Sequence, residues 1–227
     1  MRGRAFSGTL ILACFWDREF ISLLSSAIIE DIKNVQDANS SLIAYHYFDF
    51  KDESKRNVRG LLTSLLFQLS CDSDICWGVL YALYTKCRDG SEQPSDAVLA
   101  GCLKSMLELP GQLPIFVIMD AIDECPITTG TPSAREKVLD FVEDLVGSNH
   151  PNLFICITSR PEQDIQAVIN PLTPTSRRVS IHEEAGQRED IDNYVRSFVQ
   201  EDRAMRRWRT DDKNLIISTL SERANGM

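Results

Sequence analysis

Continuous apolar runs are the clearest pattern in this sequence. Residues 115–119 are apolar without alternation, and residues 42–50 and 152–161 contain similar runs rich in β-branched and aromatic side chains. Runs of this kind are typical of strands that are buried on both faces of a parallel sheet. Two further strands are predicted at residues 9–16 and 177–181.

Segments with apolar residues at helical spacing alternate with these runs. They cover residues 20–32, 58–69, 75–87, 95–109 and 135–146, and after the last strand residues 190–198 and 214–224. In the segment 75–87 we expect the largely aromatic stripe of Trp77, Leu80, Tyr81 and Tyr84 to face the core. The alternation predicts right-handed βαβ units. The expected fold is α/β, a P-loop NTPase-like, mostly parallel sheet with flanking helices, followed by the start of a helical region.

Three acidic residues follow the apolar run 115–119. Asp120 ends the run, and Asp123 and Glu124 come directly after it. In open α/β sheets, ligands bind beyond the carboxyl ends of the strands. Carboxylates placed there need a partner of opposite charge, and hydrated Mg²⁺ carrying the phosphates of a nucleotide is the simplest one. The pattern is that of a Walker B strand; the alternative is a buried strand that runs into an acidic surface loop.

The predicted strand 152–161 also ends on polar residues. Ser159 and Arg160 stand at its carboxyl end, and Pro161 prevents the ladder from continuing. An arginine at this place can reach a phosphate with a forked pair of hydrogen bonds. The alternative is that Arg160 pairs with the neighbouring acids.

Charge and composition exclude several classes of protein. The net charge of −9 argues against a general nucleic-acid or anionic-membrane binder. No segment reaches the roughly 18 apolar residues of a membrane span. Arg2 and Arg4 before the apolar residues 10–16 resemble a signal peptide, but no small-residue cleavage site follows Trp16. The seven cysteines form no C-x-x-C pair, so we expect reduced thiols, no zinc site and a cytoplasmic protein.

Several of these segments together resemble a known family. They are residues 45–50, 61–69, 93–95, 120–126 (Asp-Ala-Ile-Asp-Glu-Cys-Pro), 158–161 (Thr-Ser-Arg-Pro) and 190–196. The sequence is similar to fungal NACHT-type NTPases, and more narrowly to the nephrocystin 3-like N-terminal domain. These belong to the STAND class of signal-transducing ATPases. The resemblance covers residues 23–227.

The resemblance implies a role for each polar residue at the two strand ends. Asp120 would hold Mg²⁺ through water, and Asp123 or Glu124 would orient or deprotonate the attacking water. Arg160 would sense the γ-phosphate of ATP or GTP, assisted by Ser159. Protein partners would be reached through flanking or repeat domains, and the full-length protein would be a possible homo-oligomer.

One essential motif of this family is missing. Its members carry G-x-x-x-x-G-K-[ST] before the first helix, where backbone N–H groups cradle the phosphates and the lysine neutralises them. Here Ile21 stands where the lysine belongs, Ser22 takes the hydroxyl position, and no glycine lies between Gly8 and Gly60. Losing these contacts removes roughly 4–8 kcal/mol, on the order of 10³-fold or more in affinity. We therefore expect weak nucleotide binding and little hydrolysis.

The resemblance divides the chain into three segments and leaves two possible functions. Residues 1–22 form an atypical segment in place of the phosphate loop, residues 23–185 the NACHT-like core, and residues 186–227 the start of a truncated helical subdomain. The missing loop has two possible explanations, a misassigned gene start or exon and a degenerate paralogue. Because the helix after the loop is intact, the misassigned start or exon is favoured. The expected function is a Mg-ATP switch in signalling; the alternative is a non-catalytic scaffold or pseudo-NTPase acting through protein–protein contacts.

Overall fold

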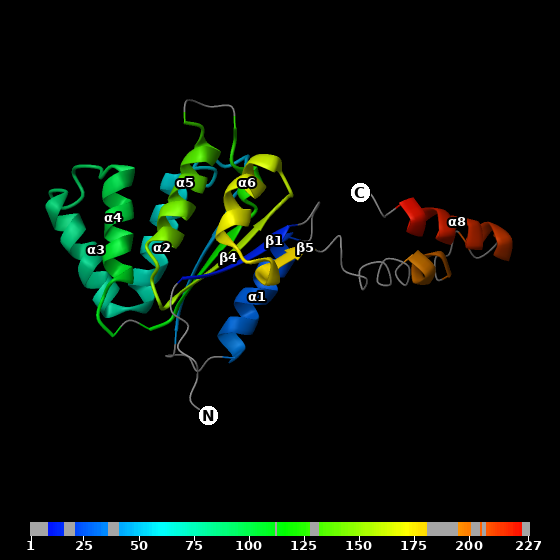
Figure 1. Cartoon of the computed structure of the whole chain (residues 1–227), viewed down its shortest axis with the longest axis horizontal. Coiled ribbons are helices and arrows are strands. Elements are labelled where there is room, and N and C mark those ends of the chain that lie inside the picture. The colour runs from blue at the N-terminus through cyan, green and yellow to red at the C-terminus, as the bar shows by residue number, and fades with distance from the viewer. Residues whose placement is uncertain are drawn as a thin grey trace. The chain divides into compact units, whose positions relative to one another are not determined.

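A computed structural model of the protein describes residues 9–15, 21–35, 41–111, 113–127, 132–180, 195–200, 205 and 208–223. The chain divides into two compact units, Met1–Val179 and Ser180–Met227 (Figure 1). The first unit carries the sheet and its helices. The second contains a helical stretch at residues 195–200 and helix α8 (Thr210–Arg223). The predicted helical residues 190–194 lie outside the described part of the chain.

Five strands form one sheet in the order β2-β3-β4-β1-β5. Their bounds are Leu10–Phe15 (β1), Leu42–Tyr47 (β2), Ile115–Asp120 (β3), Leu153–Ser159 (β4) and Arg178–Ser180 (β5). The β2–β3, β3–β4 and β4–β1 pairs are all parallel, and Met119 lies opposite both His46 and Ile157. Parallel pairing with helical crossovers confirms the predicted α/β, P-loop NTPase-like class.

Within the described residues of the first unit, six α-helices flank these strands. They are α1 (Ile21–Val35), α2 (Val58–Asp72), α3 (Asp74–Lys86), α4 (Asp96–Leu107), α5 (Ala134–Gly147) and α6 (Gln163–Leu172). Local sequence explains where they begin. The side chains of Asn57 and Ser95 cap α2 and α4, and Ser133 and Glu136 form a capping box at the start of α5. None of the described helices combines the length and the apolar composition needed to cross a bilayer.

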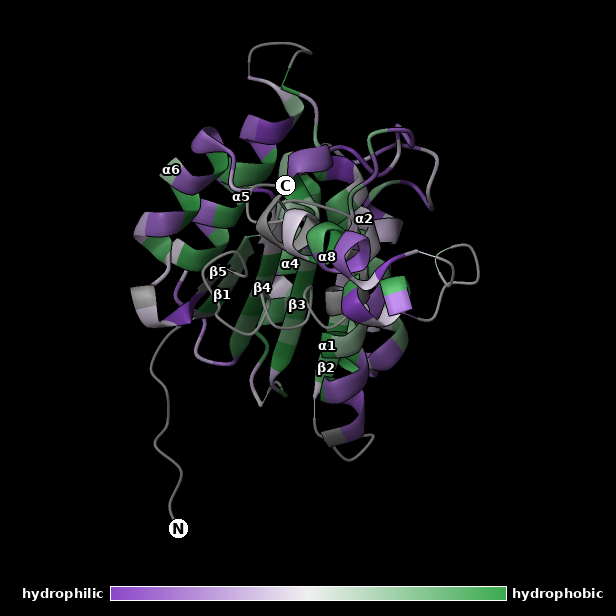
Figure 2. Ribbon diagram, turned by 90° about the vertical axis from the view of Figure 1, so that its right-hand side faces the viewer, coloured by the Kyte–Doolittle hydropathy of each residue, from purple (hydrophilic) through white to green (hydrophobic). Residues whose placement is uncertain are grey.

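The sheet separates two hydrophobic cores of unequal size. Among the described helices of the first unit, α2, α4, α5 and α6 cover one face and bury most of the apolar residues, whereas α1 covers the other face (Figure 1). The smaller core centres on Ile29 of α1, Ile118 and Cys156. Figure 2 colours these strands green, the colour of hydrophobic residues, and apolar cores lie against both faces of the sheet. This burial on both faces explains why the strand sequences are continuous apolar runs.

The aromatic stripe of α3 is the main departure from the predicted core. Trp77 and Tyr81 are each 55% exposed and Tyr84 is 48% exposed, with successive rings stacked at 6.4 and 6.3 Å between centroids. The prediction that they face the core is wrong because α3 packs on the outside of α2 and α4. It does so through Cys76, Val79 and Leu83, together with Leu80, the residue of the predicted stripe that does pack against the core. Both faces of α3 are apolar, so periodicity alone does not identify the buried one.

Candidate functional site

The carboxyl ends of β3 and β4 meet at one edge of the sheet because the strands are parallel neighbours. Asp120, the last residue of β3, is only 1% exposed. Its Oδ1 accepts a hydrogen bond from Thr158 Oγ1 at 2.7 Å and a second from the hydroxyl of Ser25 on α1. Thr158 Oγ1 also accepts the N–H of Ala121 at 3.0 Å. One buried carboxylate is thus fixed by hydroxyls from two different elements.

A tight turn follows Asp120. Ala121 adopts a left-handed conformation (φ 57°, ψ 53°), and residues Ile122–Glu124 form a 3₁₀ turn. A left-handed alanine costs roughly 1–2 kcal/mol, which the surrounding contacts must offset. The fully buried Ile122 and the hydrogen bond to Thr158 are two such contacts. The turn directs Asp123 back toward the end of β4.

Asp123 and Arg160 form an ion pair across the two strand ends. Asp123 Oδ2 lies 3.2 Å from Arg160 Nε, and its Oδ1 accepts the backbone N–H of Arg160 at 3.1 Å and the hydroxyl of Ser159 at 3.4 Å. The Asp123 side chain is 4% exposed and that of Arg160 is 48% exposed. The structure therefore contains the pairing with a neighbouring acid that the sequence left as an alternative. Glu124 instead accepts the N–H of Phe50 at 3.2 Å.

Arg135 is a buried cation that the sequence reasoning missed. It is 4% exposed, and its guanidinium donates to the carbonyl oxygens of Cys125, at 3.0 Å, and Asp123. It also binds the carboxylates of Glu162 and, at 3.2 Å, Asp164. It therefore ties the acidic turn to the start of α6. The detectable signal was a charged residue in the apolar stripe of α5, which continues through Val138, Leu139, Val142 and Leu145.

The serine of α1 that the family motif assigns to the site is not the serine that contacts Asp120 in the structure. Ser22 lies in the first turn of α1, but its side chain is outside the described residues. Ser25, one turn later, is fully buried and provides the hydroxyl that reaches Asp120. Residues 16–20, where the phosphate loop would end, also lie outside the described residues.

A surface pocket of about 420 Å³ opens beside the acidic turn. The formal charges of the arginines and acids that line it cancel. The positive side chains are Arg56, Arg135 and Arg160, and the negative ones are Asp123, Glu124 and Glu162. The arginines are already engaged, Arg56 with the carboxylate of Glu53 at 2.7 Å. A triphosphate would therefore meet no net positive charge from these six side chains.

The residues of this site lie within the part of the chain that matches a known family. A family model described as Nephrocystin 3, N-terminal, matches residues 22–160, more than half of the chain. The chain belongs to the nephrocystin 3 N-terminal family. The matched region of this family begins at Ser22 and ends at Arg160, so it includes both strand ends and all three acids of the turn. A comparison with curated proteins found no significant match.

Proposed function

We propose that this nephrocystin 3 N-terminal domain is a nucleotide-binding signalling domain of the NACHT/STAND type. Mg²⁺ with ATP or GTP would bind at the carboxyl edge of the sheet. The observation that carries the proposal is the Asp120 carboxylate, which is buried and held by hydroxyls from α1 and β4. A buried carboxylate needs strong compensation, and a bound cation is a common reason to maintain one.

The side chains at this edge fit a hydrated magnesium ion. Mg²⁺ prefers hard oxygen ligands and retains several waters, so one carboxylate and one hydroxyl suffice when phosphate oxygens complete the shell. Asp120 and Ser25, whose side chains are hydrogen-bonded to each other, would supply these two groups. When bound, the ion would neutralise phosphate charge that the balanced pocket does not. Asp123 or Glu124 would orient the attacking water.

The phosphates themselves would have few partners. Arg160 and Ser159 would be the groups that contact the γ-phosphate, and Ser22 occupies the hydroxyl position of the missing motif. Ile21 replaces the motif lysine, and no glycine cradle precedes it. The roughly 10³-fold loss of affinity estimated from these absences corresponds to millimolar binding if the intact motif gives micromolar binding.

A second candidate function is a non-catalytic scaffold that works through protein–protein contacts. Two observations favour it. Arg160 is paired with Asp123 rather than directed at an open phosphate position, and α3 presents an exposed aromatic surface. Its protein partners would be reached through flanking or repeat domains, and a homo-oligomer of the longer protein is the corresponding assembly.

Thermal unfolding with Mg-ATP and Mg-GTP separates the two functions. A ligand with a Kd of about 1 mM, present at about 10 mM, stabilises the native state by about 1.4 kcal/mol. For a chain of this size we expect a rise in Tm of about 3–6 °C. The rise should require Mg²⁺, because the nucleotide alone lacks the ion that Asp120 would hold.

Two single-charge variants control for non-specific stabilisation. Asp120→Asn retains a hydrogen-bond acceptor for Ser25 and Thr158 but removes the charge, so its Tm should no longer rise with Mg-ATP. Asp140→Asn removes an exposed carboxylate on α5 and should behave like the unmodified chain. If neither nucleotide raises the Tm of the unmodified chain at about 10 mM, the scaffold function is favoured.

A further inference from the structure

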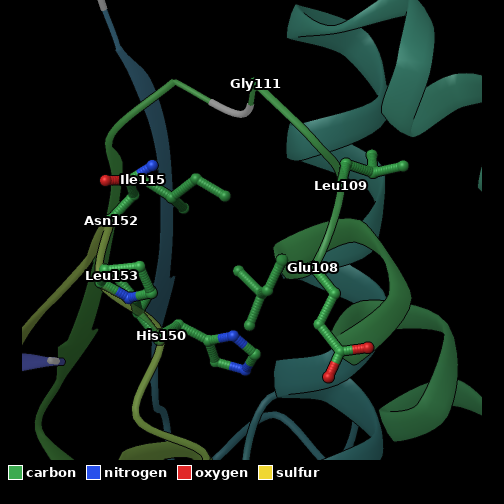
Figure 3. Close-up of a pocket in the computed structure, with 9 residues that line it drawn as sticks. Glu108, Leu109, Gly111, Ile115, His150, Asn152 and Leu153 are labelled. Carbon is green, nitrogen blue, oxygen red and sulfur yellow. The ribbon is translucent and has the colours of Figure 1, made fainter.

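One strand at the end of the sheet has a strand neighbour on only one side. Among the described strands, β2 ends the order β2-β3-β4-β1-β5, and Figure 2 shows it on the far side of the sheet from β5. The inner strand β3 is bonded on both sides. At its start Ile115 donates its N–H to the carbonyl oxygen of Asn152 at 2.8 Å (Figure 3), and Pro114 accepts the N–H of Leu42 at 2.8 Å. The outer side of β2 is therefore an edge of the described sheet.

The backbone groups of β2 alternate between β3 and this outer edge. Leu42 and Phe48 donate their N–H groups to carbonyl oxygens on the β3 side, at 2.8 and 3.0 Å. Because strand geometry repeats every two residues, the N–H and C=O groups of Ile43, Tyr45 and Tyr47 point to the outer side. A row of such groups at an edge is a template on which another strand can pair.

A side chain of α2 occupies the middle of this edge. Gln68 Oε1 accepts the N–H of Tyr45 at 3.2 Å, and Gln68 Nε2 donates to the Tyr45 carbonyl oxygen at 2.7 Å. The hydroxyl of Ser64 donates to the same carbonyl oxygen at 3.2 Å and accepts a hydrogen bond from Gln68 Nε2 at 3.0 Å. Two reciprocal bonds to one residue are the pattern of a hydrogen-bonded pair in an antiparallel sheet. The amide of Gln68 therefore takes the place that a residue of a neighbouring strand would fill.

Without Gln68 the edge would be complementary to itself. If two β2 strands paired in antiparallel fashion about a two-fold axis at Tyr45, that residue would bond to Tyr45 of the second copy, and Ile43 would bond to its Tyr47. All three outward residues would then have partners. We propose that Gln68 is an edge guard, a side chain that holds the backbone of Tyr45 and prevents a second copy of the chain from pairing with β2. Neither the nucleotide-binding function nor the scaffold function depends on this role.

The test removes the guard from the whole chain and measures self-association. Gln68→Ala deletes both bonds to Tyr45 and leaves a good helix former on α2. Gln166→Ala is the matched control, because Gln166 is also half-buried on a helix but its side chain bonds to no described residue. By sedimentation velocity, Gln68→Ala should dimerise at concentrations at least about 25-fold lower than the unmodified chain and the control. The reason is that each unmodified copy must first break two hydrogen bonds, each contributing about fivefold.

Amide hydrogen exchange shows whether the dimer uses this edge. In the monomer, the Tyr45 N–H of Gln68→Ala should exchange at least about fivefold faster than in the unmodified chain, because it has lost its acceptor. As the dimer forms, the N–H groups of Ile43, Tyr45 and Tyr47 should become protected together. The proposal is overturned if Gln68→Ala associates no more strongly than the control, or if its dimer leaves the Tyr45 N–H unprotected. If the alanine variant does not fold, Gln68→Asn, whose amide is one methylene shorter in reach, replaces it in both measurements.

Discussion

Replacing Thr158 with valine should destabilise the protein more than any exposed threonine substitution. Thr158 is 1% exposed, and its hydroxyl donates to the Asp120 carboxylate while accepting the Ala121 N–H. Valine has nearly the same shape but can do neither. The substitution therefore leaves the packing almost unchanged and isolates the two hydrogen bonds that hold the end of β3 against β4.

The expected destabilisation can be estimated from the groups that lose a hydrogen bond. A hydrogen bond to a charged group contributes about 1.5–3 kcal/mol, and leaving the Ala121 N–H without its acceptor adds about 1 kcal/mol. Ser25 still donates to Asp120, so the carboxylate keeps one hydroxyl partner. We expect a loss of about 2.5–4 kcal/mol in the free energy of unfolding. For a chain of this length that corresponds to a decrease in Tm of about 5–15 °C.

Urea denaturation provides the measurement, with Thr63→Val as the matched control. Thr63 is exposed on α2, and its hydroxyl bonds only to carbonyl oxygens of its own helix. The control should change the free energy of unfolding by less than about 0.5 kcal/mol. A double-mutant cycle with Asp120→Asn should show coupling between positions 120 and 158. If Thr158→Val is no more destabilised than the control, the hydrogen bonds assigned to Thr158 do not stabilise this edge.

Two further predictions concern buried titratable groups. Burial lowers the pKa of His46, with the Lys55 carbonyl opposing the shift and the Lys55 charge adding to it, and burial also lowers the pKa of His150. Below pH ~6.5 the unfolded chain therefore binds more protons than the native protein. The free energy of unfolding should be highest above that pH and should decrease as the pH falls toward the lowered pKa values of the two histidines. Equal free energies of unfolding at pH 7.5 and 5.5 would contradict this prediction. Burial raises the pKa of the fully buried Cys125 to about 12, so a maleimide should modify the exposed Cys71 in the native protein and spare Cys125, as peptide mass spectrometry can check.

The sequence alone was sufficient for the parts of the fold that depend on local pattern. β3 and β4 are predicted because short uninterrupted apolar runs, bounded by turn residues, are typical of strands buried on both faces. Once the two strands are parallel neighbours, Asp120 must lie near Thr158, and Asp123 lies within reach of Arg160. The proximity of the acids to the arginine therefore follows from the fold class and from where each polar residue stands in its strand.

Contacts that depend on the rotation and depth of a helix were not predictable in this way. Ser25 reaches Asp120 only because α1 packs across β3 with that face inward. The helix carries three serines, Ser22, Ser25 and Ser26, and the sequence does not indicate which of them faces the strand. Apolar spacing alone does not identify Arg135 as buried, although it lies on the same face of α5 as Val138, Leu139 and Val142. The aromatic residues of α3 were misplaced because both of its faces are apolar and only tertiary packing selects one.

The pairing of Asp123 with Arg160 shows why a motif does not by itself define a function. Arg160 is about half exposed, and ion pairs at exposed positions contribute only about 0–1 kcal/mol. A single charge-assisted bond to phosphate contributes about 1.5–3 kcal/mol, so a phosphate held nearby would displace Asp123 from Arg160. Without a glycine cradle and lysine, however, little holds the phosphate there. If the proposed nucleotide site exists, its affinity would depend on the residues before Ser22, and the ion pair would rearrange only after a phosphate had bound.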